Sequence, residues 1–290
     1  KFQKVVVCNN IPPTREDTLQ KIQGVDGVLW AHTDKVNGEV LDAAGKQLKV
    51  ISTMTSGIDY VEIPTVKERG VLLGNTPGAV NVCVAELAIG LMLAAGRRFQ
   101  HGRRIIETST WETNHIDWMY GQEIRGSVVG FFGFGGIGQA VAERLKPFGV
   151  KKMITIQEGS FQMKTNLEQV IESDFIVVAS PLTEQTREIF NEAAFNKMKK
   201  NCVFVNVGRG QIVEQNSLIK ALKEGKIFSA GLDVMTPEPL PASHELMTLE
   251  NCVVIPHLGT ATLQTTTDMA LIAAQNILNG LEGIPLPAGV

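Results

Sequence analysis

Short apolar runs alternate with amphipathic stretches along most of the chain. Before residue 80, the pattern predicts strands at 4–8, 27–30, 48–54 and 71–74 and helices at 15–22, 38–44 and 64–69. After residue 126, it predicts strands at 128–132, 152–156, 174–179, 202–207, 228–234 and 252–256 and helices at 139–145, 192–198 and 217–224. Apolar strands that alternate with helices form parallel sheets covered on both faces. The pattern therefore predicts an α/β fold.

Two further helices define the expected domain organisation. Residues 81–95 form a long apolar helix after a turn at 75–78, which contains Pro77 and Gly78 and indicates a crossing between lobes. A last helix at 265–279 is long enough to return to the first lobe. We therefore expect two Rossmann-like lobes with parallel sheets. One is discontinuous in sequence, made of 1–77 and 262–290, and the other spans 78–261.

Residues 97–125 do not follow this alternation. The segment is polar and aromatic, with Trp111, Trp118 and Tyr120 among charged residues and no clean period. It could be a surface loop or an arm that packs on another subunit. Exposed aromatic side chains favour the arm, and hence a homodimer.

A glycine-rich turn lies between the strand at 128–132 and the helix that follows. Gly133, Gly135 and Gly138 form the pattern G-x-G-x-x-G. The strand–turn–helix context is the one that a dinucleotide-binding turn requires. Free N–H groups at the start of such a helix bind phosphate. We therefore expect the lobe at 78–261 to bind a dinucleotide.

Composition and net charge limit the kinds of partner that the chain is expected to bind. The chain has 290 residues, 44% hydrophobic and 20% charged, with a net charge of −3. This balance argues against a nucleic-acid or membrane surface, and no apolar run reaches the length of a membrane helix. The four cysteines stand apart in apolar runs, so we expect buried thiols in a cytoplasmic protein. No histidine spacing indicates a metal site.

Candidate chemical groups follow the predicted strands, where ligands of doubly wound sheets bind. They are Ser56, Gly57, Arg209, Asp233, Glu238 and His257. His257 is a candidate general acid or base, and Glu238 could orient it and raise its pKa. Arg209 could bind a carboxylate through its fork of N–H groups, and Asp233 could bind a nicotinamide amide. Each residue alone has an equally good structural explanation in a turn or cap. Their recurrence at strand ends favours function.

At these residues the chain resembles the D-isomer-specific 2-hydroxyacid dehydrogenases, over nearly its whole length. The specific stretches are FVNVGRG, GLDVMTPEPLP and, at 253–262, VVIPHLGTAT. LDAAGKQLKVISTMTSGID at 41–59 and RLKPFGV at 144–150 are most similar to the glyoxylate/hydroxypyruvate reductases of that family.

The resemblance implies a role for each site residue. It makes His257 the proton donor, Glu238 its carboxylate partner and Arg209 the substrate clamp. The substrate set also includes Ser56, Gly57, Thr260 and Trp118, a tryptophan that the family lends to the neighbouring subunit. The implied cofactor set is Gly133, Gly135, Gly136, Ile137, Gly138, Pro181, Val207, Asp233 and Gly259. The segments 1–77 and 262–290 become the substrate-binding domain, and 78–261 the dinucleotide-binding domain.

The chain also departs from the family pattern. Gly136 stands where an arginine is usual, which removes one potential phosphate contact. Residues 157–159 follow the strand at 152–156, and in the family the residue just past this strand normally selects NAD or NADP. The stretch from there to Asp174 is shorter than the family's by roughly one short helix, judged against a typical βα unit. Asn10–Pro12 is short in the same way, with a strand absent. Glu158 is therefore not read as a marker for NAD. The most similar enzymes of the family use NADPH, so the resemblance favours NADP, with NAD as the alternative.

The resemblance implies hydride transfer from NAD(P)H to a small 2-oxo acid, glyoxylate or hydroxypyruvate, bound between closing lobes. Within the family, phosphoglycerate dehydrogenase is the runner-up. Formate dehydrogenases pair the histidine with glutamine, so Glu238 favours hydroxyacid chemistry. A nucleotide-sensing binding protein, such as the corepressors of this fold, is the alternative from another class.

Overall fold

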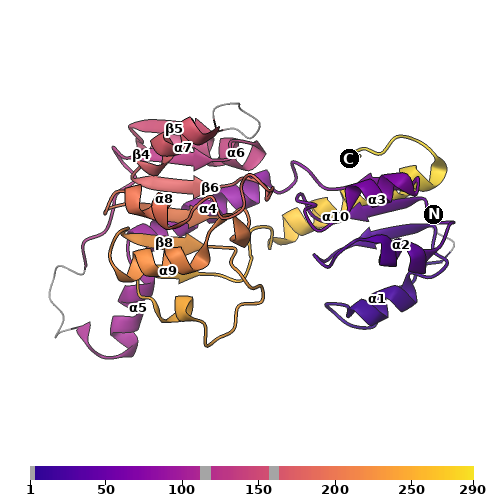
Figure 1. Cartoon of the computed structure of the whole chain (residues 1–290), viewed down its shortest axis with the longest axis horizontal. Helices are drawn as coiled ribbons and strands as arrows, with labels where there is room; N and C mark the ends of the chain where they lie inside the picture. The colour runs from indigo at the N-terminus through magenta and orange to yellow at the C-terminus, as the bar shows by residue number, and fades with distance from the viewer. Residues whose placement is uncertain (1–3, 112–118, 157–162) are drawn as a thin grey trace. The chain divides into compact units, whose positions relative to one another are not determined.

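The structure is a computed structural model that describes residues 4–111, 119–156 and 163–290. The chain divides into two compact units (Figure 1). The first unit combines residues 1–80 with 261–290, and the second spans 81–260. Among the described residues, no helix is long and apolar enough to cross a membrane.

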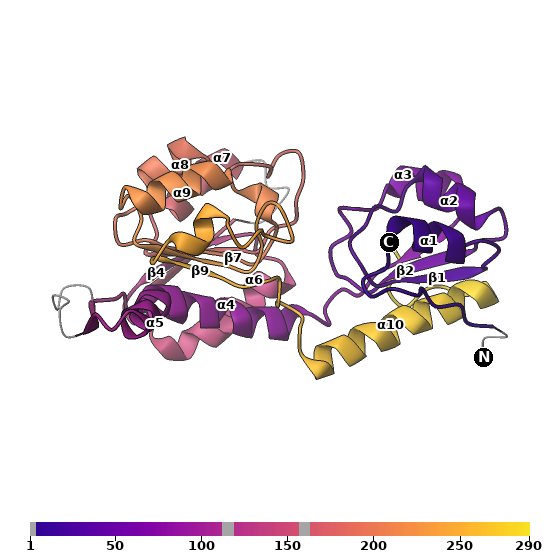
Figure 2. The same ribbon diagram turned by 90° about the horizontal axis from the view of Figure 1, so that it is seen from below.

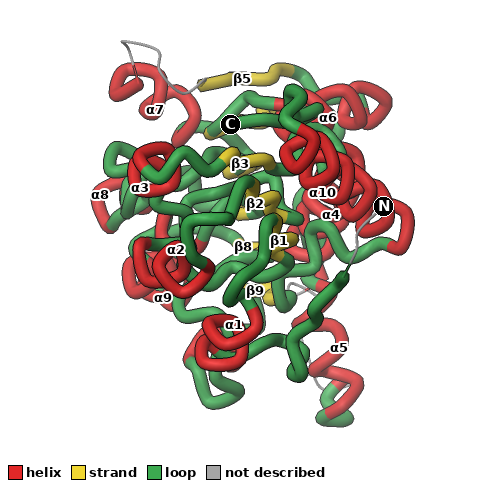
Figure 3. The backbone as a smooth tube through the Cα atoms, turned by 90° about the vertical axis from the view of Figure 1, so that its right-hand side faces the viewer, coloured by secondary structure: helices red, strands yellow, loops and turns green. Residues whose placement is uncertain are grey.

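The first unit is a three-stranded parallel sheet of β1 (Gly27–Trp30), β2 (Val50–Thr53) and β3 (Leu72–Gly74), in that order. One face carries the helices α1 (Arg15–Lys21), α2 (Gly38–Ala44) and α3 (Ile63–Glu68). The helix α10 (Leu263–Glu282) covers the other face (Figures 2 and 3). All residues of the central strand β2 are buried, as expected for a strand covered on both sides.

Helix α10 is built into the first unit by close contacts. The α-carbon of Gly280 lies so near β2 that a Cβ there would sit 2.6 Å from Val50. The buried amide of Asn276 donates to Ser52 Oγ at 3.0 Å and to the Asn75 carbonyl at 3.1 Å. The C-terminal helix is therefore part of the N-terminal unit's core.

The second unit is a six-stranded parallel sheet in the order β5-β4-β6-β7-β8-β9. The strands are β4 (Val128–Phe132), β5 (Lys152–Ile156), β6 (Phe175–Val178), β7 (Val203–Asn206), β8 (Ser229–Leu232) and β9 (Cys252–Val254). One face carries α4 (Asn81–Gly96), α5 (Phe99–Glu107) and α6 (Gly136–Leu145), and the other α7 (Met163–Ile171), α8 (Glu192–Lys197) and α9 (Gln215–Lys223) (Figure 2). Short 3₁₀ turns occur at Lys146–Phe148, Gly210–Ile212 and Glu245–Thr248.

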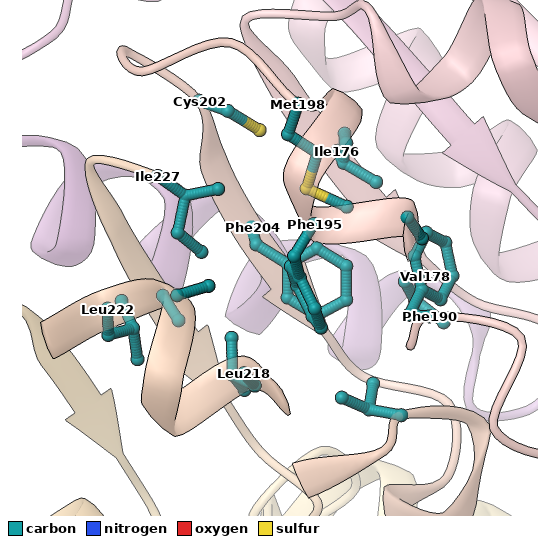
Figure 4. Close-up of a cluster of buried hydrophobic side chains, with 14 of the residues drawn as sticks. Ile176, Val178, Phe190, Phe195, Met198, Cys202, Phe204, Leu218, Leu222 and Ile227 are labelled. Carbon is teal, nitrogen blue, oxygen red and sulfur yellow. The ribbon is translucent and has the colours of Figure 1, made fainter. Parts of the chain in front are cut away.

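A hydrophobic cluster packs the sheet of the second unit against α8 and α9, and it includes several aromatic pairs (Figure 4). Phe190 makes edge contacts with Phe132 of β4 and Phe204 of β7, each at 5.1 Å between ring centroids. Phe195 of α8 adds a third at 5.5 Å. Such pairs add about 0.5–1.5 kcal/mol each beyond their buried area. The cluster therefore holds strands in register whose ends carry candidate site residues.

Four of the described α-helices begin at a residue whose side chain accepts a backbone N–H. Thr14, Asn37, Asn191 and Thr262 cap α1, α2, α8 and α10 in this way. Such caps satisfy one of the free N–H groups at a helix start and stabilise it by about 1 kcal/mol. Helix α6 begins after Gly135, which has no side chain, and its start has no side-chain cap bond.

The structure confirms the predicted α/β class and nearly all predicted elements, with ends shifted by a few residues. The predicted strand at 4–8 is wrong: residues 4–8 form no strand, and Val5 and Val7 are about 70% exposed. A short apolar run does not make a strand without a neighbouring strand to bond. Helices α5 and α7 were not predicted, although residues 97–125 were noted as a distinct segment.

Candidate active site

The strand order of the second unit indicates where along the edge of the sheet a ligand would bind. Strand β4 has β5 on one side and β6 on the other, so the direction of winding reverses between β4 and β6. Ligands of open parallel sheets bind beyond the carboxyl ends of the strands at such a switch point. The turn Gly133–Gly138 follows β4 at this position.

The three motif glycines play different structural parts. Gly133 has φ of +93°, and a Cβ there would lie 2.5 Å from the Ser180 nitrogen after β6. A Cβ on Gly138 would lie 2.5 Å from the Gly133 carbonyl oxygen. A Cβ on Gly135 would meet nothing within 4 Å. Gly133 and Gly138 are thus required by the turn itself, whereas Gly135 presents bare backbone to a ligand.

The start of α6 fits an anionic group. The first bond within the helix runs from the Gln139 N–H to the Gly135 carbonyl at 3.0 Å. The N–H groups of Gly136, Ile137 and Gly138 therefore have no acceptor within the helix. Open backbone with aligned N–H donors is the cradle that dinucleotide phosphates occupy.

Asn81, the first residue of α4, is a feature that the sequence analysis did not single out. Its amide lies against Gly136, where a Cβ would be 2.3 Å from Asn81 Nδ2. The position at which an arginine is usual is thus filled by a side chain from another helix. The two residues are 55 positions apart in the sequence (136 − 81), so no local motif reveals the contact.

The loops after β6 and β7 lie beside this turn. Pro181 follows β6, where its carbonyl accepts the Thr186 hydroxyl at 2.9 Å. Val207 is buried after β7 and donates its N–H to Val178 at 3.0 Å. A Cβ on Gly208 would be 2.7 Å from the Ser180 carbonyl oxygen, so the two loops touch. These predicted cofactor residues therefore lie on adjoining strand ends.

The predicted pair His257–Glu238 is formed. His257 Nδ1 lies 2.8 Å from Glu238 Oε2, and Glu238 Oε1 accepts the Met235 N–H at 2.9 Å. With Nδ1 donating to the carboxylate, Nε2 is the atom through which the imidazole can pass a proton outward. Both side chains keep part of their surface exposed, 42% for His257 and 35% for Glu238.

Asp233 holds the backbone that carries His257. The Asp233 carbonyl accepts the His257 N–H at 2.9 Å, while its carboxylate oxygens accept the N–H groups of Leu258 at 2.6 Å and Gly259 at 3.0 Å. The carboxylate is buried at the end of β8. Asp233 thus caps the loop in this structure, and each oxygen retains a second lone pair for a ligand.

These surroundings shift the pKa values of His257, Glu238 and Asp233. The hydrogen bond to Glu238 raises the pKa of His257, and it outweighs burial, which acts in the opposite direction. Burial acts to raise the pKa of Glu238, but the bonds from His257 and Met235 hold that pKa below its ordinary value. Burial raises the pKa of Asp233. A histidine with a raised pKa stays protonated at higher pH, which suits a proton donor.

Arg209 lies on the loop after β7, next to the Glu238 loop. A Cβ on Gly210 would be 2.1 Å from the Met235 carbonyl oxygen, so the two loops are in direct contact. Arg209 Nη1 donates to the Gly208 carbonyl at 2.9 Å. The positive charge of Arg209 acts to lower the pKa of both Glu238 and His257, although the pKa of His257 stays raised overall. The second unit therefore brings Arg209, Glu238 and His257 into one cluster.

The other predicted substrate residues lie elsewhere in the chain. Ser56 and Gly57 follow β2 in the first unit, and neither N–H has an acceptor among the described residues. Thr260 lies in the turn before α10 at the end of the second unit. Trp118 and the segment 157–159 lie outside the described residues.

Comparison with known proteins identifies the family. Residues 89–259 match the model of the D-isomer specific 2-hydroxyacid dehydrogenase NAD binding domain. The chain belongs to the D-isomer-specific 2-hydroxyacid dehydrogenase family. The resemblance inferred from the sequence motifs is thereby confirmed, and the glycine-rich turn lies in the matched NAD binding domain.

Individual relatives agree with this family. Glyoxylate reductase/hydroxypyruvate reductase of Mus musculus is 42% identical over 286 residues, which cover 96% of this chain and 87% of the relative. The solved TT0316 protein from Thermus thermophilus has a TM-score of 0.86 at 34% identity and covers 95% of this chain and 89% of its own. An NADPH-dependent glyoxylate/hydroxypyruvate reductase from Sinorhizobium meliloti, solved with NADP and malonate, has a TM-score of 0.81 at 27% identity, covering 96% and 86%.

Proposed function

We propose that this dehydrogenase reduces a small 2-oxo acid, glyoxylate or hydroxypyruvate, to the D-2-hydroxy acid with NADPH, NADH being the alternative cofactor. The observation that carries the proposal is the His257–Glu238 pair, formed at 2.8 Å in the unit that holds the dinucleotide turn. The name of the mouse relative and the NADP bound to the Sinorhizobium enzyme support the substrate and the cofactor.

The cofactor would be held by the glycine-rich turn and its neighbouring loops. The free N–H groups of Gly136, Ile137 and Gly138 would bind its phosphates, and the bare backbone at Gly135 would let them approach. Pro181, Val207, Asp233 and Gly259 would complete the site from the following strand ends. When bound, the reduced nicotinamide supplies the hydride.

The chain's own residues then bind the acid and supply the proton. Arg209 would hold the substrate carboxylate through two of its N–H groups. The backbone N–H groups of Ser56 and Gly57 stay predicted contacts to the substrate. Protonated His257 donates from Nε2 to the keto oxygen as it becomes a hydroxyl. Glu238 keeps the imidazole oriented and protonated through Nδ1. Thr260 lies three residues after His257, where it can contact the substrate.

This assignment gives each part of the chain a role. Residues 1–77 and 262–290 would form the substrate-binding domain and 78–261 the dinucleotide-binding domain. The compact units, 1–80 with 261–290 and 81–260, support boundaries near these residues. Three of the four cysteines are buried free thiols, which supports a cytoplasmic location.

We propose further that the chain forms a homodimer through the 97–125 arm. The arm exposes large apolar side chains: Phe99 and Ile106 are each 62% exposed and Tyr120 is 66% exposed. Exposed apolar surface of this kind is typical of protein–protein interfaces. Trp118 would then reach the neighbouring subunit's active site.

A spectrophotometric assay tests the proposed function. NADPH or NADH is mixed with glyoxylate, hydroxypyruvate or phosphohydroxypyruvate, and loss of reduced-nicotinamide absorbance is followed for the wild type and His257→Ala. We expect turnover with the first two acids and a loss of roughly 10²–10⁴-fold in the variant. Preference for phosphohydroxypyruvate would indicate a phosphoglycerate dehydrogenase. No turnover with any acid would favour a binding protein, and unchanged turnover in the variant would remove His257 from the mechanism.

A further inference from the structure

The loop that carries Glu238 is poorly fixed by burial. Met235 at its start is buried, but Thr236, Pro237, Glu238 and Pro239 are all exposed. Core packing therefore ends three residues before the carboxylate that pairs with His257. Because burial does not fix this loop, its position depends on a hydrogen-bonded contact with a neighbouring element.

Gln215 makes that contact. Its Oε1 accepts the Thr236 N–H at 2.8 Å, and its Nε2 donates to the Thr236 carbonyl. One side-chain amide thus binds both backbone polar groups of a single loop residue, as a neighbouring strand does in a sheet. Gln215 is the first residue of α9, which is anchored in the core by Leu218 and Leu222.

The bonds continue from this contact to the imidazole. Thr236 is followed two residues later by Glu238, whose Oε1 accepts the Met235 N–H at 2.9 Å. Its Oε2 pairs with His257. Gln215 therefore holds the backbone of Thr236, and the bond from the Met235 N–H holds the Glu238 carboxylate, so the loop is fixed at two successive residues. With the loop fixed there, the carboxylate is presented to Nδ1 in a single orientation.

We propose that Gln215 is a positioning residue for the Glu238–His257 pair, acting by clamping the backbone of Thr236. It touches neither the imidazole nor the carboxylate, so its effect is transmitted through the loop. The inference rests on the proposed function, in which that pair supplies the proton. It adds a residue of helix α9 to a proton-donating pair whose own members lie on loops.

Gln215 could instead have a purely structural role, which has to be distinguished from the proposed positioning role. Gln215 Nε2 also lies 3.2 Å from His244 Nε2, and His244 Nδ1 caps the turn Glu245–Thr248 by accepting the Leu246 N–H. Gln215 could therefore serve only to tie that turn to α9. Removal of His244 separates the two possibilities, because it breaks the tie and leaves the Thr236 clamp in place.

The test compares Gln215→Met with two controls in the full chain. Methionine has a similar length and makes neither hydrogen bond to Thr236. Asn216→Leu changes the next, exposed residue of α9, and His244→Ala removes the second contact of Gln215. For each variant we measure the melting temperature, the NADPH dissociation constant by fluorescence, kcat and KM. We also follow the imidazole titration of His257 by NMR in the free protein, assigned with His257→Ala.

We expect Gln215→Met to lower kcat roughly tenfold, a fraction of what a general acid contributes, with NADPH affinity unchanged. The titration of His257 should move to lower pH, because a mispositioned Glu238 no longer raises the pKa of the imidazole as strongly. Both controls should retain the wild-type kcat and titration.

Two results overturn the inference: a wild-type kcat and titration in Gln215→Met, or the same losses in His244→Ala. If His257→Ala itself keeps full turnover, the proposed function fails instead. The NMR titration still reports on the clamp in that case, because it requires no turnover.

Discussion

Among single residues, His257 shows how a reactive position is held. Its φ of +52° lies in the left-handed region, which costs a non-glycine residue on the order of 1–2 kcal/mol. Three backbone N–H groups bound by Asp233 offset that cost and fix the ring near Glu238. A typical surface loop would relax into an ordinary conformation. The strain thus marks a position determined by its surroundings.

The pH dependence of reduction follows from the His257–Glu238 bond. Proton donation needs the imidazolium, and the Glu238 bond raises the pKa of His257 above its ordinary value. Reduction should therefore be fast at low pH and decline as pH rises through that raised pKa. In Glu238→Gln the charge is lost, so the decline should begin at lower pH. A kcat/KM profile measures this, and a decline at unchanged pH would show that Glu238 does not support the imidazole.

Arg209→Lys tests the carboxylate clamp. A lysine keeps the charge but replaces a planar fork with a single ammonium group. Loss of one charge-assisted hydrogen bond costs about 1.5–3 kcal/mol, or roughly 10- to 150-fold in kcat/KM. We expect a raised KM and a lower kcat, with the melting temperature little changed. Steady-state kinetics indifferent to the substitution would mean that Arg209 does not bind the substrate.

At the scale of elements, the apolar pattern was sufficient wherever a segment is buried in its own unit. Strands β4 and β5 and the start of α8 lie where the sequence places them. The pattern failed where neighbours decide the outcome. Residues 4–8 contain an apolar run like that of a buried strand but bond to no strand, and α5 lies in a segment where charges and aromatics obscure the period.

The residues of the candidate site could likewise be predicted only in part. Glycines and polar groups after strands are visible in the sequence because parallel strands end at one edge. The Asn81–Gly136 contact and the Gln215–Thr236 clamp were not visible. Both join residues from different elements through amide side chains, which have many ordinary surface uses. Only the packing of α4 on α6, and of α9 beside the β8 loop, brings them together.

The glycine-rich turn offers a matched pair of substitutions. Gly133→Ala places a Cβ against the backbone of residues 179 and 180 at a positive φ, so it should destabilise the protein by about 1–3 kcal/mol. Gly135→Ala meets open space and should leave the melting temperature unchanged. It should nevertheless weaken NADPH binding, because the methyl group keeps phosphate from the backbone. Normal NADPH affinity in Gly135→Ala would contradict the assigned cofactor site.

At the scale of the whole molecule, one unit is discontinuous in sequence and the other is continuous. The first unit needs both ends of the chain, because α10 closes the face of a sheet built from residues before 75. The second is continuous and contains the dinucleotide turn, Arg209, Glu238 and His257. The groups proposed for hydride and proton transfer are therefore all positioned by one compact unit.

The proposed dimer gives a prediction at the same scale. Ile106→Glu places a charge on the exposed apolar face of the arm and should convert a dimer to monomers, because an unpaired charge is costly in an apolar interface. Leu271→Glu, on α10, is the control, since Leu271 is similarly exposed at 64% outside the arm. Light scattering measures both masses. A monomeric wild type, or a dimeric Ile106→Glu, would contradict the arm as the interface.

The fate of the hydride tests the central claim most directly. NADPH deuterated at the transferring position is incubated with hydroxypyruvate and the enzyme, and the glycerate formed is examined by chiral separation and mass spectrometry. The account predicts D-glycerate carrying one deuterium on C2, the carbon next to the carboxylate. Product of the L configuration, product without deuterium, or no product with either deuterated NADPH or deuterated NADH would contradict it.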